Sequence, residues 1–173
     1  MSRNRGSGSG PFLIAAGFFM LCVAVCVSAF VMADHLSRVG QDVNHGVLAA
    51  ESLVERVKAG NTGDFGTYEP DEVFGTVFEN WKTKDPEAKA VYQYIKDGGE
   101  VRNYQILWDK EWNSYPDTKE LEKNGKKLAY VGLITTGVKD QMKEIAVVIF
   151  GYGTCGDQGY KIYHLFAEQY VKP

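Results

Sequence analysis

The feature that most constrains this chain is an uncharged apolar run near its N-terminus, P-F-L-I-A-A-G-F-F-M-L-C-V-A-V-C-V-S-A-F-V-M-A. It covers residues 11–33, which are 23 residues without a charged or amide side chain. A helix of about 20 apolar residues is long enough to span the hydrocarbon core of a bilayer. A cleaved signal peptide is the alternative, because Val31-Met32-Ala33 resembles a small-residue cleavage site, but its apolar region would be only about 7–15 residues long. We therefore expect a single transmembrane helix that is retained.

The charges that flank this run predict its orientation. Arg3 and Arg5 precede it without an acidic residue, whereas the mixed sequence D-H-L-S-R follows it. Positively charged flanks tend to stay in the cytoplasm. We expect residues 1–10 to be a flexible cytoplasmic tail, whose Gly-Ser repeat is of native or engineered origin, and residues 34–173 to form one periplasmic or otherwise extracytoplasmic domain anchored in the inner membrane.

One side of the predicted membrane helix carries small residues. On a helical wheel Gly17, Ala24 and Ser28 form a stripe, with larger side chains on roughly the opposite side (Phe12, Phe19, Val23 and Phe30). Small residues allow a second helix to approach closely. The stripe favours helix packing with a partner subunit, although small residues are also common in any spanning helix.

Charge and cysteine content exclude some classes of protein. Of the 19 basic residues 17 lie beyond the tail, together with all 22 acidic residues, and no basic stripe marks a nucleic-acid surface. Two of the three cysteines, Cys22 and Cys26, lie in the apolar run, so Cys155 is the only thiol beyond it. We expect no nucleic-acid partner and no disulfide within the exported domain.

After residue 33, apolar residues continue at the spacing of a helix face. They recur from Leu36 to Val57, which predicts that the first helix continues to about Ala59 and ends at Gly60. A second, short helix is expected over 73–81, after the acidic residues Glu69, Asp71 and Glu72. In K-D-P-E-A-K-A-V-Y-Q-Y-I-K-D-G-G a capping Asp85, a proline in the first turn and Gly98 as the stop predict a third helix.

The hydrophobic period changes from 3.6 to 2 after Glu100. Strands are expected over 101–108, 126–136, 142–152 and 160–171, with hairpin-length connections between the last three. The strand over 142–152 is apolar on both faces and should be central. Helices followed by an antiparallel meander predict an α+β fold, with the long helix lying across a sheet of about four strands.

Gly151, Gly153 and Gly156 spell the dinucleotide-binding pattern G-x-G-x-x-G. That pattern requires a helix to follow it, whereas the residues after Gly159 alternate in polarity as a strand does. Strict alternation would place Tyr160, Ile162, His164 and Phe166 on one face. The glycines are therefore interpreted as a hairpin loop.

The order of elements over residues 35–171 resembles the NTF2-like or cystatin-like cone, and an anchor before such a domain is similar to the VirB8-type subunits of secretion machines. This resemblance implies a helix-covered sheet with an open pocket at one end. The strands from N-G-K-K-L-A-Y-V to E-Q-Y-V-K-P also resemble the opening strands of exported FMN-binding domains of the RnfG and NqrC kind. Their S-G-A-T and T-P-G-L-G motifs are absent from this sequence.

Few residues of the sequence are candidates for catalysis, metal binding or ligand binding. His164, Tyr130 and Glu168 are the polar groups that we expect at a pocket of the sheet, with Glu144 on the strand beside Glu168. His164 is interpreted first as a hydrogen-bonded core or pocket histidine. His35 and His45 are ten residues apart on one helix, too far to hold one metal ion. We expect no catalytic residue, metal or cofactor.

The exported part is rich in tyrosine and tryptophan, residue types that favour interfaces but also line sheets. The sequence thus predicts a non-enzymatic accessory, assembly or scaffold subunit of a larger membrane complex, of a secretion, electron-transfer or photosynthetic type. The alternatives are a ligand-binding or enzymatic domain that uses the pocket, flavin-type or other, and a self-associating secretion component.

Overall fold

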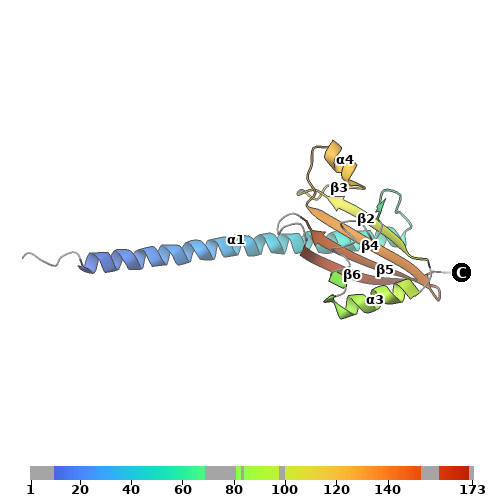
Figure 1. Ribbon diagram of the computed structural model, residues 1–173, viewed down its shortest axis with the longest axis horizontal. Coiled ribbons are helices and arrows are strands. Elements are labelled where there is room, and N and C mark those ends of the chain that lie inside the picture. Colours follow the sequence, from blue (N-terminus) through green and yellow to red (C-terminus); the bar gives the residue numbers. More distant parts are fainter. Residues whose placement is uncertain (1–9, 69–80, 83, 98–99, 153–159, 172–173) are drawn as a thin grey trace, which may run out of the picture. The chain divides into compact units, whose positions relative to one another are not determined.

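The computed structural model describes residues 10–68, 81–82, 84–97, 100–152 and 160–171 (Figure 1). The chain divides into two compact units, Met1–Gln41 and Asp42–Pro173. Helix α1, Gly10–Lys58, contributes residues to both units. The predicted short helix over 73–81 lies almost wholly outside the described residues, as do Glu69, Asp71, Glu72, Cys155 and most of the glycine loop.

Helix α1 ends where the sequence predicts. Gly60 adopts a φ of +73°, the left-handed conformation that glycine takes without steric cost. The Gly60 amide donates to the Val57 carbonyl and the Asn61 amide donates to the Arg56 carbonyl, so the last turn is capped. Within the described residues α1 is the one helix long and apolar enough to cross a membrane, and its large apolar side chains from Phe12 to Met32 are exposed.

The described residues of the second unit form one antiparallel sheet of six strands. The strands are β1 (Gly66–Thr67), β2 (Arg102–Trp108), β3 (Ser114–Tyr115), β4 (Tyr130–Lys139), β5 (Met142–Gly151) and β6 (Tyr160–Tyr170). Their order is β1-β2-β4-β5-β6, and β3 pairs with β2 outside this path. The α+β class and the four long strands are confirmed. The prediction of about four strands is too low, because β1 and β3 have two residues each and leave no alternating pattern.

Helices cover the two faces of the sheet (Figure 1). The last turns of α1 bury Ala50, Leu53, Val54 and Val57 against Ile106, Ile134, Ile145, Val147 and Ile149. Helix α3, Pro86–Asp97, buries Ala88, Tyr92 and Ile95 against Leu107, Leu133, Ala146 and Val148. Because β5 contributes side chains to both layers, its central position is confirmed.

Helix α3 begins at its predicted cap. The Asp85 carboxylate accepts the amides of Glu87 and Ala88 at 3.1 and 3.2 Å. Near its other end α3 approaches β4 so closely that a Cβ at Gly137 would lie 2.8 Å from the Ile95 side chain. The absence of a side chain at Gly137 therefore lets the helix lie directly on the sheet.

A β-bulge in β6 corrects the predicted faces. The strand pairs regularly with β5 from Tyr170 to Tyr163, then shifts so that Lys161 lies opposite Phe150 and Tyr160 opposite Gly151. The extra residue, Ile162, reverses the alternation before it. Tyr160 and Ile162 therefore lie on the α1 face, whereas His164 and Phe166 lie on the α3 face.

The polar stretch after β2 folds around one buried carboxylate. Asp109 is 1% exposed and accepts the amides of Glu111 and Asn113, the Asn113 side-chain amide and the Tyr115 hydroxyl. Burial opposes its ionisation, but these hydrogen bonds outweigh burial and lower the pKa of Asp109 to about 2. A short helix, α4 (Thr118–Lys123), follows and is capped by Asp117.

Candidate functional site

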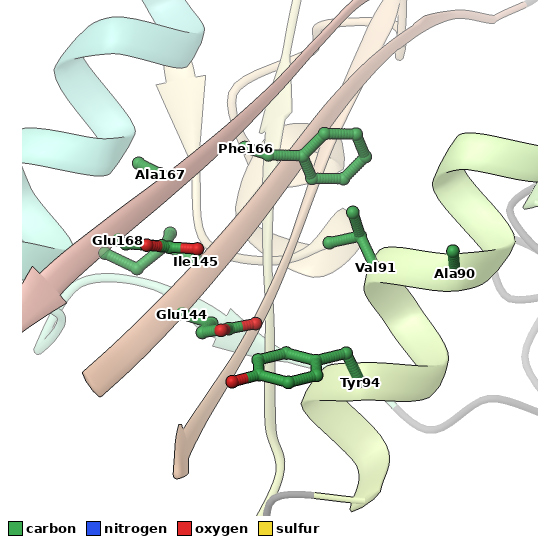
Figure 2. Close-up of a pocket in the computed structure, with 8 residues that line it drawn as sticks. All are labelled: Ala90, Val91, Tyr94, Glu144, Ile145, Phe166, Ala167 and Glu168. Atoms are coloured by element: carbon green, nitrogen blue, oxygen red, sulfur yellow. The ribbon is translucent and has the colours of Figure 1, made fainter. Parts of the chain in front are cut away.

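An open cleft lies between α3 and the ends of β5 and β6 (Figure 2). Its volume is about 670 Å³, within the range of small-molecule sites. The lining residues are Ala90, Val91, Tyr94, Glu144, Ile145, Phe166, Ala167 and Glu168. We call it the α3 cleft. One wall is a helix and the other a sheet, so both walls belong to the rigid core of the second unit.

Two carboxylates lie together in the α3 cleft. Glu144 and Glu168 are direct partners in the antiparallel register of β5 and β6. Side chains at such positions share one face and are neighbours. Glu144 is only 6% exposed, whereas Glu168 is exposed. The sequence predicted that Glu144 lies on the strand next to that of Glu168, and the register confirms that the two strands are neighbours.

The surroundings of Glu144 favour its protonated form. Burial raises the pKa of Glu144, and the negative charge of Glu168 raises it further. The positive charge of Lys139 and the hydroxyl of Tyr94, which lies beside Glu144, act in the opposite direction. Among the described residues, neither glutamate forms an ion pair within 4 Å.

The apolar surface of the cleft comes from both of its walls. Figure 2 shows Phe166 of β6 facing Val91 of α3, with Tyr94 one turn farther along the helix beside Glu144. The Lys139 ammonium lies over the Tyr94 ring, 4.3 Å from its centre. The cleft thus combines apolar surface from both walls with a pair of carboxylates at one end.

His164 lies outside the α3 cleft, although on the same face of the sheet. Its ring packs against Trp81 and Phe166, at 5.5 and 5.4 Å between ring centres. Lys161 lies 3.4 Å from Nδ1. Burial lowers the pKa of His164 and the Lys161 charge lowers it further, whereas the charges of Asp85 and Glu87 act in the opposite direction. This environment agrees with the interpretation of His164 as a packed histidine.

Tyr130 lies on the opposite, α1 face. Its hydroxyl donates to Asp42 at 2.7 Å, and the Tyr160 hydroxyl donates to the same carboxylate at 3.2 Å. The Tyr130 ring stacks on Trp112 at 4.1 Å. Burial and the Asp42 charge raise the pKa of Tyr130. These contacts fasten α1 to the sheet, so Tyr130 is a structural residue here.

The structure therefore does not bring together the three residues expected at one pocket. Glu168 lines the α3 cleft, His164 lies beside Trp81, and Tyr130 is separated from both by the sheet. Tyr94 was missed as a cleft residue. The only sequence signal for it is its position next to the buried face of α3, which cannot show which strand the helix covers.

The small-residue stripe of α1 is exposed in the described structure. A Cβ on Gly17 would meet no atom within 4 Å, and the Ser28 hydroxyl donates to the Ala24 carbonyl within the helix. Partner packing at Gly17, Ala24 and Ser28 thus stays a prediction.

Many of the tyrosines and tryptophans of the second unit pack in or against its core. Trp108 and Tyr130 are buried, and Tyr104, Trp112, Tyr115 and Tyr163 pack against the two core layers. Tyr170, which is 62% exposed, is the exception among the tyrosines of β6.

The described residues contain no group of three His, Cys, Asp or Glu side chains that could hold a metal ion. What the α3 cleft can offer is negative charge, a phenolic hydroxyl and apolar surface. Comparisons of the chain with protein-family models, with curated proteins and with solved structures found no match. Function is therefore inferred from the geometry of the described residues.

Proposed function

We propose that this chain is a single-pass membrane protein whose α+β domain serves as a non-enzymatic accessory, assembly or scaffold subunit of a larger membrane complex. Residues 11–33 would cross the inner membrane with the N-terminus in the cytoplasm, and the second unit would act outside it through protein–protein contact. Partners are other subunits and the lipid bilayer, through α1.

The apolar surface of α1 supports the membrane part of the proposal. Phe12, Phe18, Phe19 and Phe30 are between 68% and 79% exposed. A continuous apolar surface of this kind is unstable in water and requires lipid or protein to cover it. The uncharged run also has the length of a bilayer crossing.

The observation that carries the contact function is the outer edge of β6. Among the described strands, this eleven-residue strand pairs only with β5, and its other edge has no strand partner. Proteins usually protect such an edge with short strands, charges, proline or a bulge. In β6 the bulge and Lys161 lie at one end and Glu168 near the other, whereas the run from Tyr163 to Ala167 has no acidic residue, lysine, arginine or proline. An added strand from a partner would satisfy this edge.

The experiment that tests the proposal measures the native mass of the protein extracted from its own membranes in mild detergent. We expect the untagged chain to migrate with a much larger assembly that contains other proteins. Migration near 19.2 kDa plus detergent would contradict the proposal. An assembly that contains only copies of this chain would replace it with the self-associating alternative.

Proline substitutions at neighbouring positions test the role of the β6 edge. The backbone groups of consecutive strand residues point to opposite edges, so Ala167→Pro and Glu168→Pro form a matched pair. One substitution removes a hydrogen bond to β5 and lowers the melting temperature, whereas the other affects the outer edge. We expect the variant that keeps its melting temperature to migrate no longer with the large assembly. If that folded variant stays in the assembly, β6 is not the contact edge.

A second candidate function, the binding of a small molecule, is favoured by the α3 cleft. The cleft uses side chains on the α3 face of the sheet, whereas the contact function uses the outer backbone edge of β6, and the two share Phe166, Ala167 and Glu168.

A further inference from the structure

The α3 cleft keeps an unfavourable arrangement of charge. Like charges placed directly opposite on neighbouring antiparallel strands destabilise a sheet, and the cost is larger where one of them is buried. Glu144 and Glu168 are placed in this way, and Glu144 is almost completely buried. An apolar or amide side chain at either position would remove the repulsion. Either a proton on Glu144 or a positive charge that joins the pair would also remove it.

No side chain of the described residues supplies that charge. The charge of Lys139 acts on Glu144, but its ammonium lies over the Tyr94 ring and forms no ion pair with either glutamate. Lys143 and Lys161 have other partners, since they contact the Val57 carbonyl and Asp85. The space between the two carboxylates and Tyr94 opens instead into the cleft (Figure 2).

The shape and polarity of the cleft select among cations. Calcium requires 6–8 oxygen ligands and magnesium about six in octahedral geometry, whereas the cleft offers two carboxylates and one phenol. A protonated primary amine has three N–H donors, which matches these three groups. The apolar surface of Val91 and Phe166, next to the carboxylates, would contact the carbon skeleton of such a molecule, and the aromatic rings also attract a cation.

We propose that the α3 cleft is a binding site for a small organic amine. Its ammonium group lies between Glu144 and Glu168 and donates to both carboxylates, with Tyr94 as the third contact. Its apolar part lies against Val91 and Phe166. This site rests on the small-molecule binding suggested for the α3 cleft and does not depend on the contact function, although both use residues of β6.

Calorimetric titration of the full-length protein in detergent tests this site with three probes, butylamine, 2-phenylethylamine and 1,4-diaminobutane. 2-Phenylethanol, in which a hydroxyl replaces the ammonium, is the matched neutral compound. We expect saturable 1:1 binding of at least one amine at millimolar concentration or below. The alcohol should bind at least about tenfold more weakly than 2-phenylethylamine if the latter binds. The absence of saturable binding by all three amines, or equal affinity for 2-phenylethylamine and the alcohol, would overturn the proposal.

Two variants locate the site. Glu144→Gln and Glu168→Gln keep the size of each side chain but remove its charge, and each should weaken amine binding at least about tenfold. Glu122→Gln, at an exposed glutamate of α4, is the matched control and should bind as the native protein does. Because removal of one charge relieves the repulsion, the Glu144→Gln variant should melt no lower than the native protein. Unchanged binding in both cleft variants would place the amine elsewhere.

The pH dependence provides an independent readout. A proton on Glu144 competes with the ammonium group, so amine affinity should decrease as the pH falls through the raised pKa of Glu144. Glu168 of β6, Lys139 of β4 and Tyr94 of α3 are the titratable groups that act on it. The Glu144→Gln variant should lose most of this dependence. If its affinity varies with pH as that of the native protein does, Glu144 is not the group that contacts the ammonium.

Discussion

The buried carboxylate of Asp109 predicts how stability changes in acid. Four protein groups donate to it: the amides of Glu111 and Asn113, the side chain of Asn113 and the hydroxyl of Tyr115. The Lys126 ammonium lies 3.6 Å from it. Protonation removes the negative charge that these donors stabilise. The native protein therefore resists this protonation, which lowers the pKa from 3.8 to about 2.

This difference in pKa gives the size of the effect. One pKa unit corresponds to about 1.36 kcal/mol, so a change from 3.8 to about 2 corresponds to about 2.4 kcal/mol of stability. Because the folded pKa is the lower one, this stability is fully present above about pH 4. It is lost as the pH falls through about 2. Asp109→Asn should lower the free energy of unfolding at pH 7 by about 2 kcal/mol and remove this part of the acid dependence.

Urea unfolding of the full-length protein in mild detergent, followed by tryptophan fluorescence, measures this free energy at several pH values. The matched control is Asp140→Asn in the turn between β4 and β5. Asp140 is exposed, and its φ of +49° is one that asparagine also tolerates. The control should keep the stability of the native protein at pH 7. An Asp109→Asn variant that retains the native stability and the native loss below pH 4 would refute the reasoning.

Two further predictions use the same unfolding measurement. Gly60→Ala should lower the free energy of unfolding by about 1–2 kcal/mol, because alanine is strained at a φ of +73°. Gly63→Ala, where a side chain would enter open space, should change this free energy by less than about 0.5 kcal/mol. Equal losses in the two variants would be inconsistent with the cap at Gly60. Tyr130→Phe should lower the free energy of unfolding by about 1–2 kcal/mol, because the hydrogen bond to Asp42 is lost. Tyr170→Phe, at an exposed tyrosine, should lower it by less than half as much. The reverse order would argue against a structural role of Tyr130.

Local sequence signals predicted the elements well because each signal has a local physical cause. Asp85 caps α3 through amides two and three residues away, and Gly60 ends α1 through its own φ. The length and apolarity of residues 11–33 likewise need no knowledge of the rest of the chain. These are properties of segments, and the structure reproduces them.

The faces of β6 were predicted wrongly because alternation is reliable only in an uninterrupted strand. Ile162 is inserted at the bulge, so residues before it lie on the face opposite to the one expected. Tyr160 thereby reaches Asp42 on the α1 side, whereas His164 contacts Trp81 on the α3 side. Nothing in the spacing of apolar residues marks this insertion.

The sequence by itself determined the apolar helix, the α+β class and the four long strands, because periodicity, caps and run lengths are local. It also placed Glu144 and Glu168 on neighbouring strands. Only the tertiary structure decided which groups share a site. The register of β5 and β6 sets the two glutamates directly opposite each other, and the docking of α3 brings Tyr94 beside them. These are contacts between residues distant in sequence, and they depend on how whole elements pack.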